Sequence, residues 1–365
     1  MILESLSLLN FRNISGADIS FSANINCFLG NNGMGKTNLL DAVYYLSFCK
    51  SCSNIPDSQS IRRGEQFFML RGDYATPGNE ERTEIHCGVK PHQKKVFKRD
   101  RKEYDRLSEH IGFIPLVLVS PEDNELVREG SDIRRRFIDQ TLSQFDREYL
   151  SAVMAYNRVL ASRNALLRRE EAEVSLYEII EEQMEALAAF IHKRREVFIA
   201  DFVPVFNSFY RDISGGGESV SLSYKSHMNE GSLQPQLSAS RRRDLAVGYT
   251  TRGIHKDDLE MEMNGFPVKR FGSQGQMKSY SIALRFAQFD FLKSMGGKTP
   301  ILLLDDIFDK LDAGRVERIM EIVSGDRFGQ IFVTDTNREY LDGIVRKTGG
   351  DFKLFGVENG DIKEI

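Results

Sequence analysis

The strongest constraint on the fold of this 365-residue chain is the stretch FLGNNGMGKTNLLDAVYYL at residues 28–46. An apolar run leads into a loop with the pattern G-x-x-x-x-G-K-[ST], in which Gly30, Gly35, Lys36 and Thr37 are in register. After the loop, apolar residues recur at helical spacing. A strand, a glycine-rich loop and a helix, in that order, are typical of a phosphate-binding loop. The sequence therefore predicts an α/β domain that holds a nucleoside triphosphate.

The loop supplies the groups that a triphosphate needs. Its glycines allow backbone amides to point at phosphate oxygens, and the following helix adds the positive end of its dipole. Lys36 is expected to neutralise phosphate charge, and the Thr37 hydroxyl is expected to bind Mg²⁺. The predicted ATP site comprises Gly30, Asn31, Asn32, Gly33, Met34, Gly35, Lys36, Thr37 and Asn38.

Two carboxylates at the end of another apolar strand belong to the same predicted site. Residues 301–306 read ILLLDD, which is typical of a buried parallel strand, and ligands bind at the carboxyl ends of such strands. Asp305 is expected to hold the water shell of Mg²⁺, and Asp306 to orient or polarise the attacking water. Lys36, Asp305 and Asp306 are thus the predicted catalytic residues, and Thr37 and Asp305 the predicted metal residues.

A third segment, Ser273-Gln274-Gly275-Gln276, directly precedes a helical apolar stretch. Serine and glycine at the start of a helix form an anion site from a hydroxyl, backbone amides and the helix dipole. Taken alone, the segment is more typical of an ordinary capped helix. A second anion site becomes meaningful only in combination with the phosphate loop.

In combination, these segments resemble the ABC-type ATPases. S-x-G-Q precedes an apolar strand that ends in Asp-Asp, and Lys310-Leu311-Asp312 follows that strand. The resemblance implies that the signature residues, Ser273 to Gln276, contact the γ-phosphate held by a second subunit. It also implies that Leu311 and Asp312 lie at the dimer interface, with ATP sandwiched between two heads.

Within that superfamily the chain resembles the RecF family of bacterial recombination mediators. The motifs are FRNI, GNNGMGKTN, LVSPED, GSDIRRRFID, YTTRGIHKDDL, SQGQMKSYSIALRFAQ and the ending VENGDIKEI. The resemblance implies a cytoplasmic, nucleoid-associated ATPase switch that closes as a homodimer on duplex or gapped DNA. It implies that this switch helps RecO and RecR to load RecA at single-strand gaps, and it places Arg12 of FRNI in the ATP site.

Two departures from transporter ATPases indicate slow hydrolysis, and the resemblance to the RecF family implies a weak ATPase that DNA stimulates. Asp306 stands where those enzymes usually have Glu, and QIFVTDTN lacks the His that they place after the next strand. We also find no glutamine for a Q-loop after the strand that contains Val117. These features suit a switch better than a pump.

The order of the patterns predicts an ABC-type ATPase head with mixed sheets, interrupted by a mainly helical lobe. Residues 1–125 and 245–365 are assigned to the head and residues 126–244 to the helical arm. The first thirty residues are expected to form two strands, the second of which delivers the phosphate loop. Two arm helices on either side of RREEAEVS should run antiparallel over roughly 35 to 45 Å at about 1.5 Å per residue. NEGSLQPQLSASRRRD is expected to be a surface loop.

A DNA partner requires a local basic surface, because the formal net charge of the chain is −4. Residues 90–106 carry eight basic and three acidic residues around Phe97 and Tyr104. A solvated hairpin explains such a charge run equally well. The preferred candidates for phosphate contact are Lys94, Lys95, Lys98, Arg99, Arg241, Arg242 and Arg243. No base-reading element is visible, so the expected readout is charge and DNA shape.

Three alternative classes use similar loops. The nucleotide-binding subunit of an ABC transporter is the main alternative, although the helical insertion, Asp306 and the absent His argue against it. A small-molecule phosphoryl transferase has no need of Ser273 to Gln276, and the segment between the loop and the signature is too short for a full SMC coiled-coil arm. The sequence shows no signal peptide or long apolar run, so no membrane association is expected. Cys49 and Cys52 form a lone C-x-x-C that lacks a second ligand pair for zinc.

Overall fold

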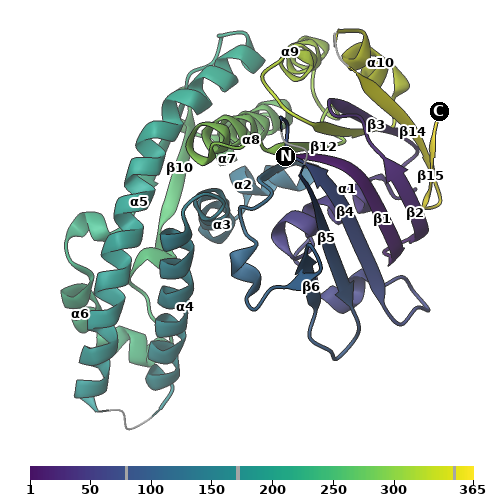
Figure 1. Cartoon of the computed structure of the whole chain (residues 1–365). Coiled ribbons are helices and arrows are strands. Elements are labelled where there is room, and N and C mark those ends of the chain that lie inside the picture. Colours follow the sequence, from purple (N-terminus) through teal and green to yellow (C-terminus); the bar gives the residue numbers. More distant parts are fainter. Residues whose placement is uncertain (79–80, 170–172, 348–350) are drawn as a thin grey trace. The chain divides into compact units, whose positions relative to one another are not determined.

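The computed structural model describes residues 1–78, 81–169, 173–347 and 351–365. By its internal contacts the chain forms two compact units. The first unit contains Met1–Asp123 and Gln288–Ile365, and the second contains Asn124–Ala287. Figure 1 traces both along the chain.

A mainly parallel sheet carries the motif-bearing strands of the first unit. Its strand order is β15-β14-β3-β13-β12-β8, and all neighbours are parallel except the β14–β15 hairpin. The strands are β3 (Ile25–Leu29), β8 (Leu116–Val119), β12 (Ile301–Asp305), β13 (Ile331–Asp335), β14 (Phe352–Glu358) and β15 (Asp361–Glu364). Every residue of β12 and β13 is buried, as expected for strands covered on both faces. The helices α1 (Lys36–Phe48), α9 (Ala313–Ser324) and α10 (Arg338–Lys347) belong to this unit.

An antiparallel sheet with the order β2-β1-β4-β5-β6-β7 completes the first unit. Its strands are β1 (Ile2–Phe11), β2 (Ile14–Ser20), β4 (Phe68–Ala75), β5 (Arg82–Val89), β6 (Val96–Arg99) and β7 (Lys102–Glu103). The prediction of two strands in the first thirty residues is wrong, because there are three. The chain leaves the β1–β2 hairpin at residues 21–24 and enters the other sheet as β3, so one continuous apolar pattern is divided between two sheets.

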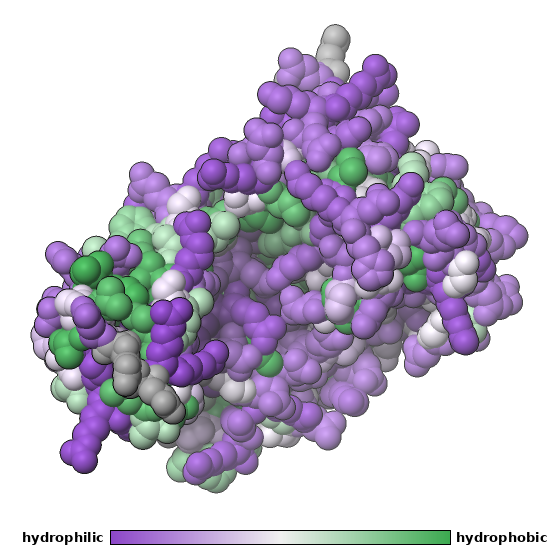
Figure 2. All heavy atoms as spheres, turned by 90° about the horizontal axis from the view of Figure 1, so that it is seen from below, coloured by the Kyte–Doolittle hydropathy of each residue, from purple (hydrophilic) through white to green (hydrophobic). Residues whose placement is uncertain are grey.

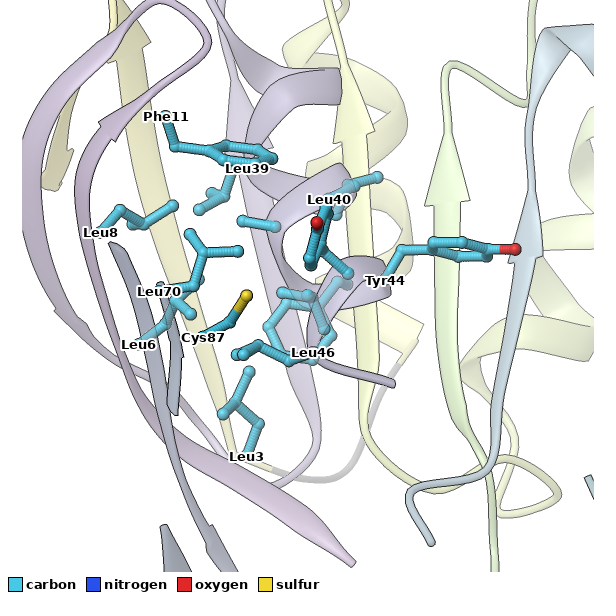
Figure 3. Packing of buried hydrophobic residues seen from close by; sticks show 14 of the residues in the cluster. Leu3, Leu6, Leu8, Phe11, Leu39, Leu40, Tyr44, Leu46, Leu70 and Cys87 are labelled. Atoms are coloured by element: carbon cyan, nitrogen blue, oxygen red, sulfur yellow. The ribbon is translucent and has the colours of Figure 1, made fainter. Parts of the chain in front are cut away.

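The core of the first unit holds α1 between the two sheets. Figure 3 shows Leu3, Leu6 and Leu8 of β1 facing Leu39 and Leu46 of α1, with Leu70 and Cys87 from the neighbouring strands. These side chains are at most 4% exposed. Burial at about 25 cal/mol per Å² of apolar surface makes this cluster the main support for the position of α1, and therefore of the phosphate loop before it.

Helices dominate the second unit. Its elements are α2 (Asn124–Arg128), α3 (Ser131–Ser143), α4 (Arg147–Leu167), α5 (Val174–Ser214), α6 (Leu233–Val247), α7 (Val268–Phe271) and most of α8 (Gln274–Gly296), with the sheet β9 (Val220–Lys225), β10 (Asp258–Met263) and β11 (Phe266–Pro267). The helices α4 and α5 lie side by side, as the arm prediction requires (Figure 1). However, α5 has 41 residues and is roughly 60 Å long at about 1.5 Å per residue, so it exceeds the predicted length.

The expected surface loop at residues 229–244 is wrong, because most of it forms α6. Pro235 lies in the first turn of that helix, where a missing amide donor costs little. Leu233 and Leu237 are completely buried and anchor the helix to its unit. The polar composition of the segment concealed these two anchors.

The unit boundary near residue 123 lies close to the predicted start of the arm, whereas the other boundary lies at 287 rather than 244. Residues 245–287 group with the helices because β10 pairs with β9 and because Arg134 of α3 forms an ion pair with Asp258 at 2.6 Å. The head and arm boundaries of the sequence analysis thus remain predictions for a division by function.

Among the described residues, no helix is both long enough and apolar enough to cross a membrane. The face seen in Figure 2 is mainly hydrophilic, with scattered apolar patches. The long helix α5 keeps charged side chains along its length, including Glu182, Lys193 and Arg211.

Candidate nucleotide site and signature segment

The phosphate loop, residues 30–35, lies between the end of β3 and the start of α1 in the first unit. Gly33 and Gly35 adopt positive φ values of 79° and 117°, which favour glycine. At Gly30 a Cβ atom would lie 2.4 Å from the carbonyl oxygen of Val357, so no larger residue fits there. No side chain caps α1. The backbone N–H groups at the start of this helix are therefore available to a ligand in the loop. In this arrangement the backbone N–H groups can donate hydrogen bonds to phosphate oxygens.

Lys36 lies folded over its own loop. Its Nζ donates to the carbonyl oxygen of Gly30 at 2.7 Å and to that of Asn31 at 3.3 Å. The same atom is 4.0 Å from Asp306 Oδ1, and the side chain is 4% exposed. A triphosphate in the loop would compete with these carbonyl oxygens for the ammonium group, and a charged acceptor makes the stronger bond.

Thr37 and Asp305 come together from positions far apart in the sequence. The Thr37 hydroxyl donates to Asp305 Oδ2 at 2.8 Å, and the Thr334 hydroxyl donates to Oδ1 at 2.6 Å. Burial raises the pKa of Asp305, while the two hydroxyl donors act in the opposite direction. Thr334 thus fixes the orientation of the carboxylate.

The residues after the two central strands add further carboxylates. Asp306 follows β12 with a positive φ of 44°, and its amide donates to Thr334 Oγ1 at 3.2 Å. Asp335 ends β13 and accepts from the amide of Asn337 at 2.7 Å. Burial raises the pKa of Asp335, and the charge of Asp306 adds to that shift. The carboxyl ends of β3, β12 and β13 therefore gather a lysine, two hydroxyls and three carboxylates at one edge of the sheet.

Thr37 and Asp305 fit a Mg²⁺ ion that is completed by phosphate and water. Both offer hard oxygen ligands and are already in contact. No cluster of three or more His, Cys, Asp or Glu side chains suited to a metal occurs in the described ranges. Two protein ligands suffice when Mg²⁺ is shared with a nucleotide, because the ion keeps several waters and binds phosphate oxygens. Bound Mg²⁺ would link the phosphates to Asp305.

Arg12 lies beside α1 and is held by an acidic side chain. Its Nη2 atom donates to Asp41 Oδ2 at 2.8 Å and to Ser51 Oγ at 2.9 Å. Its side chain is 19% exposed, and its buried Nε has no hydrogen-bond partner in the structure. The assignment of Arg12 to the ATP site remains a prediction, which requires the guanidinium to contact both Asp41 and the nucleotide.

Asn13 is a site residue that sequence reasoning missed. Its Nδ2 donates to the Met34 carbonyl at 3.1 Å, and its Oδ1 accepts from Asn38 at 2.8 Å. A Cβ atom on Gly35 would lie 2.8 Å from Asn13 Oδ1. Asn13 therefore joins the C-terminal end of the phosphate loop to the first turn of α1. Asn13 belongs to the FRNI motif, but the motif alone does not give this contact, because the contact spans separate elements.

The signature segment starts α8 in the second unit. The backbone N–H of Gln276 donates to Ser273 Oγ at 3.2 Å, and the backbone N–H of Ser273 donates to the side-chain oxygen Oε1 of Gln276 at 2.8 Å. This reciprocal pair is a capping box. Ser273 and Gln274 are exposed, whereas Met277 to Tyr280 are buried. The first turn of α8 is thus presented at the surface of its unit by a buried second turn.

The predicted dimer-interface residues precede α9. Asp312 caps that helix, since its Oδ1 accepts from the amide of Arg315 at 3.0 Å. The same bond is the main cause of the lowered pKa of Asp312, and the Arg315 charge acts in the same direction. Leu311 is half-buried and Asp312 is exposed. A capping role does not test the predicted contact with a second subunit.

The β6–β7 hairpin divides the predicted DNA residues into different environments. Lys95 is 13% exposed and donates to Asp57 at 2.6 Å, Tyr45 at 2.8 Å and the Cys49 carbonyl at 2.6 Å. Lys94 is 77% exposed. Lys98 is half-buried, and the exposed Arg99 stacks on the Phe113 ring at 4.6 Å. Lys95 therefore has a structural role, and Lys94 is the more accessible cation.

The arginine cluster on α6 shows the same division. Arg241 forms an ion pair with the buried Glu181 at 2.7 Å and lies over the Tyr177 ring at 5.1 Å. Arg242 and Arg243 are exposed. The internal contacts of Arg241 leave Arg242 and Arg243 as the candidates for phosphate contact on this helix.

The C-x-x-C thiols follow α1. Burial raises the pKa of Cys49 to about 12 and raises the pKa of Cys52 as well. Protonated thiols are poor nucleophiles and poor metal ligands. Burial thus disfavours a redox or zinc role for this pair.

Comparison with known proteins gives one consistent family. The family described as RecF/RecN/SMC N terminal domain matches residues 2–353. "DNA replication and repair protein RecF" of Phocaeicola vulgatus is 56% identical over 366 residues, which cover all of this chain and 98% of that protein. The protein of the same name from Bacteroides fragilis is 56% identical over 367 residues, covering 100% and 99%.

Solved structures agree with these relatives. The structure of the recombination mediator protein RecF with ATP in the RecFOR pathway has a TM-score of 0.88 at 27% identity, with coverage of 100% of this chain and 97% of that one. The Smc head domain from Pyrococcus furiosus has a TM-score of 0.60 at 18% identity, covering 100% and 96%, and shows a shared fold.

Proposed function

This chain belongs to the RecF family of DNA replication and repair proteins, which carry an ATPase domain of the SMC type. From that premise we propose that it is an ATP-driven switch that closes as a homodimer on duplex or gapped DNA. ATP and Mg²⁺ bind at the phosphate loop, and hydrolysis reopens the dimer. By its family, the switch acts with RecO and RecR to place RecA on single strands, in the cytoplasm at the nucleoid.

The observation that carries the proposal is the contact between Thr37 and Asp305 beside Lys36. Lys36 provides the cation for the phosphates, and Thr37 and the Asp305 carboxylate provide the oxygen ligands for Mg²⁺ at the position where the loop would bind the phosphates. Asp306, which adjoins them, is proposed to orient the attacking water. A shorter carboxylate than Glu supports slow hydrolysis, and DNA is proposed to stimulate it.

Closure by ATP requires the second anion site to act in trans. Ser273 and Gln274 are exposed at the start of α8, in a different unit from the phosphate loop. ATP bound to one subunit would then contact the signature segment of the other and would stabilise the dimer by its higher affinity for that state. Match over the full length to RecF relatives favours this function over a transporter subunit.

Sedimentation with Mg-ATP tests the proposal. Wild-type protein should dimerise with Mg-ATP, and a gapped duplex should strengthen the dimer. Ser273→Arg should still bind ATP but should remain monomeric, because a bulky cation at the capping position blocks the trans contact. Ser238→Arg is the matched control, since Ser238 is exposed on α6 of the same unit. Equal dimerisation of Ser273→Arg would remove the signature segment from the mechanism, and a monomeric wild type would refute closure by ATP.

A further inference from the structure

Glu218 links the end of the long helix α5 to the signature segment inside the second unit. One carboxylate oxygen, Oε1, accepts from Gln276 Nε2 at 2.8 Å. The other, Oε2, accepts from the hydroxyl of Tyr210 near the end of α5. We propose that Glu218 is a positioning residue that holds the signature segment in the geometry needed for the contact with nucleotide in trans. This inference rests on the proposed ATP-driven dimerisation.

The local sequence explains how Glu218 reaches both partners. α5 ends at Ser214, and Gly215 and Gly216 follow with φ values of 75° and 84°. Both of their amides donate to the Arg211 carbonyl, at 2.9 and 3.1 Å. This glycine turn reverses the chain and brings Glu218 back beside Tyr210, which lies eight residues earlier. The segment SGGGES thus ends the helix and also places Glu218 within hydrogen-bond distance of Tyr210 and Gln276.

Gln276 uses each of its side-chain groups in a different contact. Its Oε1 closes the capping box with the amide of Ser273, and its Nε2 binds Glu218. The orientation of the amide is therefore fixed by Glu218, because a flipped amide would place an oxygen against a carboxylate. Since the capping box depends on this orientation, Glu218 acts through Gln276 on the backbone of Ser273.

The hydrogen bonds from Tyr210 to Glu218 and from Gln276 to Glu218 are called the Glu218 tether below. The residues that follow the signature segment on α8 are packed rigidly. Tyr280 is one turn after Gln276 on α8 and is completely buried. Its hydroxyl donates to the carbonyl oxygen of Ser221 at 2.7 Å, and its ring packs on Phe206 of α5 with centroids 4.7 Å apart. The second turn of α8 is therefore fixed by apolar contacts, whereas the exposed first turn depends on Glu218. A shift at the end of α5 would reach the signature through Tyr210 and Glu218.

Hydrogen exchange of the protein without nucleotide tests the tether directly. In Glu218→Ala the hydrogen-bonded backbone amides of Ser273, Gln276 and Met277 should exchange about tenfold faster, because a hydrogen bond to a charged group is lost. Glu218→Gln should exchange as wild type, since its amide oxygen still accepts from Gln276 and its NH₂ group can donate to Tyr210. The matched control is Glu260→Ala, because Glu260 is exposed on β10 and pairs with Lys225 at 3.2 Å.

Sedimentation with Mg-ATP then tests the functional consequence. Glu218→Ala should weaken ATP-dependent dimerisation about tenfold. It should change ATP affinity of the monomer less than about twofold, because the phosphate loop belongs to the other unit. Glu218→Gln and Glu260→Ala should dimerise as wild type. If Glu218→Gln dimerises normally and Glu218→Ala does not, the defect of Glu218→Ala comes from the lost hydrogen bonds that position Gln276.

Unchanged exchange in Glu218→Ala would overturn the tether, and faster exchange with normal dimerisation would overturn its role in the trans contact. If wild type also fails to dimerise, the proposed function fails, and exchange still decides whether the tether exists. If Glu218→Ala does not fold, Tyr210→Phe tests the link to α5, because it removes the donor to Oε2 and otherwise only a weak contact of the hydroxyl with Met263 Sδ at 3.9 Å. That variant should accelerate the same amides about threefold, and no acceleration would overturn the link to α5.

Discussion

At the scale of single residues, the hydroxyl of Thr37 carries the predicted metal role. Thr37→Val keeps the shape of the side chain but removes the oxygen that contacts Asp305 at 2.8 Å. We expect the gain in ATP affinity produced by Mg²⁺ to fall at least about tenfold in this variant, and to persist in Thr37→Ser. Binding of a fluorescent ATP analogue, measured with Mg²⁺ and with a chelator, gives that gain. An equal gain in Thr37→Val would show that the hydroxyl does not bind the metal.

Asp305 gives the same site a pH dependence. Burial raises its pKa, so the carboxylate takes up a proton earlier than usual as the pH falls. Because Mg²⁺ needs the ionised form, the gain in affinity from Mg²⁺ should decline as the pH falls, and at a higher pH than an ordinary aspartate would give. The nucleotide phosphates also take up protons as the pH falls, so Asp305→Asn supplies the baseline. Identical pH profiles for wild type and Asp305→Asn would contradict a metal role for Asp305.

The motifs predict residue types well and contact partners poorly. Lys36, Thr37 and Asp305 were predicted from spacing and strand context, and the structure places them together. Asn13 and Glu218 escaped notice because each acts through a tertiary contact with a distant segment. The FRNI motif contains Asn13 but does not identify its partners, and a glutamate after a glycine turn has no local signature. Only the folded chain shows what these two residues contact.

At the scale of elements, the β6–β7 hairpin combines one structural lysine with more accessible ones. The double variant Lys94→Ala/Lys98→Ala should weaken duplex binding and reduce the slope of log K against log salt by about 1.8, if each lysine neutralises one phosphate. Binding measured over a range of salt concentrations gives this slope. Lys225→Ala is the control, since Lys225 is exposed on β9 of the second unit. An unchanged slope would mean that the hairpin is only a solvated surface.

Lys95 should behave differently from its neighbours. Its removal leaves Asp57 and the Tyr45 hydroxyl without their cation. We therefore expect Lys95→Ala to lower the free energy of unfolding by about 1 to 3 kcal/mol. Denaturant unfolding beside the Lys94 and Lys98 single variants measures the difference, and equal stability of all three would contradict the structural role.

Element prediction succeeded where hydrophobic periodicity was strong and failed where a few contacts decided. The helices α4 and α5 follow their apolar spacing, although α5 continues through Pro204 to Ser214. α6 was missed because its sequence is polar and Leu233 and Leu237 are its only buried apolar residues. β2 and β3 were merged because alternation continues across the bend that separates two sheets.

At the scale of the whole molecule, the order of the motifs predicted an α/β ATPase with inserted helices, and sequence patterns could not fix where the units divide. Residues 245–287 contain strand patterns that suit a head, yet β10 finds its partner in β9 after the long helix. Pairing between distant strands is set by packing of the complete chain. Periodicity reports only which face of each strand is apolar.

Each unit also contains a neutral histidine with the same pattern of hydrogen bonds, and of the two His110 is buried and His255 is half-buried. His110 contacts the Leu46 carbonyl through Nε2 at 2.7 Å and the Tyr104 hydroxyl through Nδ1 at 3.0 Å. His255 contacts the Thr250 carbonyl at 3.0 Å and the Tyr156 hydroxyl at 2.9 Å in the same way. Because a carbonyl only accepts, Nε2 carries the proton and Nδ1 accepts from tyrosine. Burial lowers both pKa values from 6.5 to about 4.

These two histidines should make both units sensitive to acid. A lowered pKa means that the unfolded chain binds the proton more tightly, so stability is complete above pH 6.5 and is lost as the pH falls toward 4. When the pH falls from 7 to 5, each histidine should lower the free energy of unfolding by roughly 2 kcal/mol. In His110→Gln and His255→Gln that loss should shrink by this amount, because glutamine offers a donor and an acceptor without titrating. Urea unfolding at both pH values, followed by hydrogen exchange of peptides from each unit, assigns the change to a unit. His92→Gln is the exposed control, and the same acid loss in all three variants would show that other groups govern the acid sensitivity.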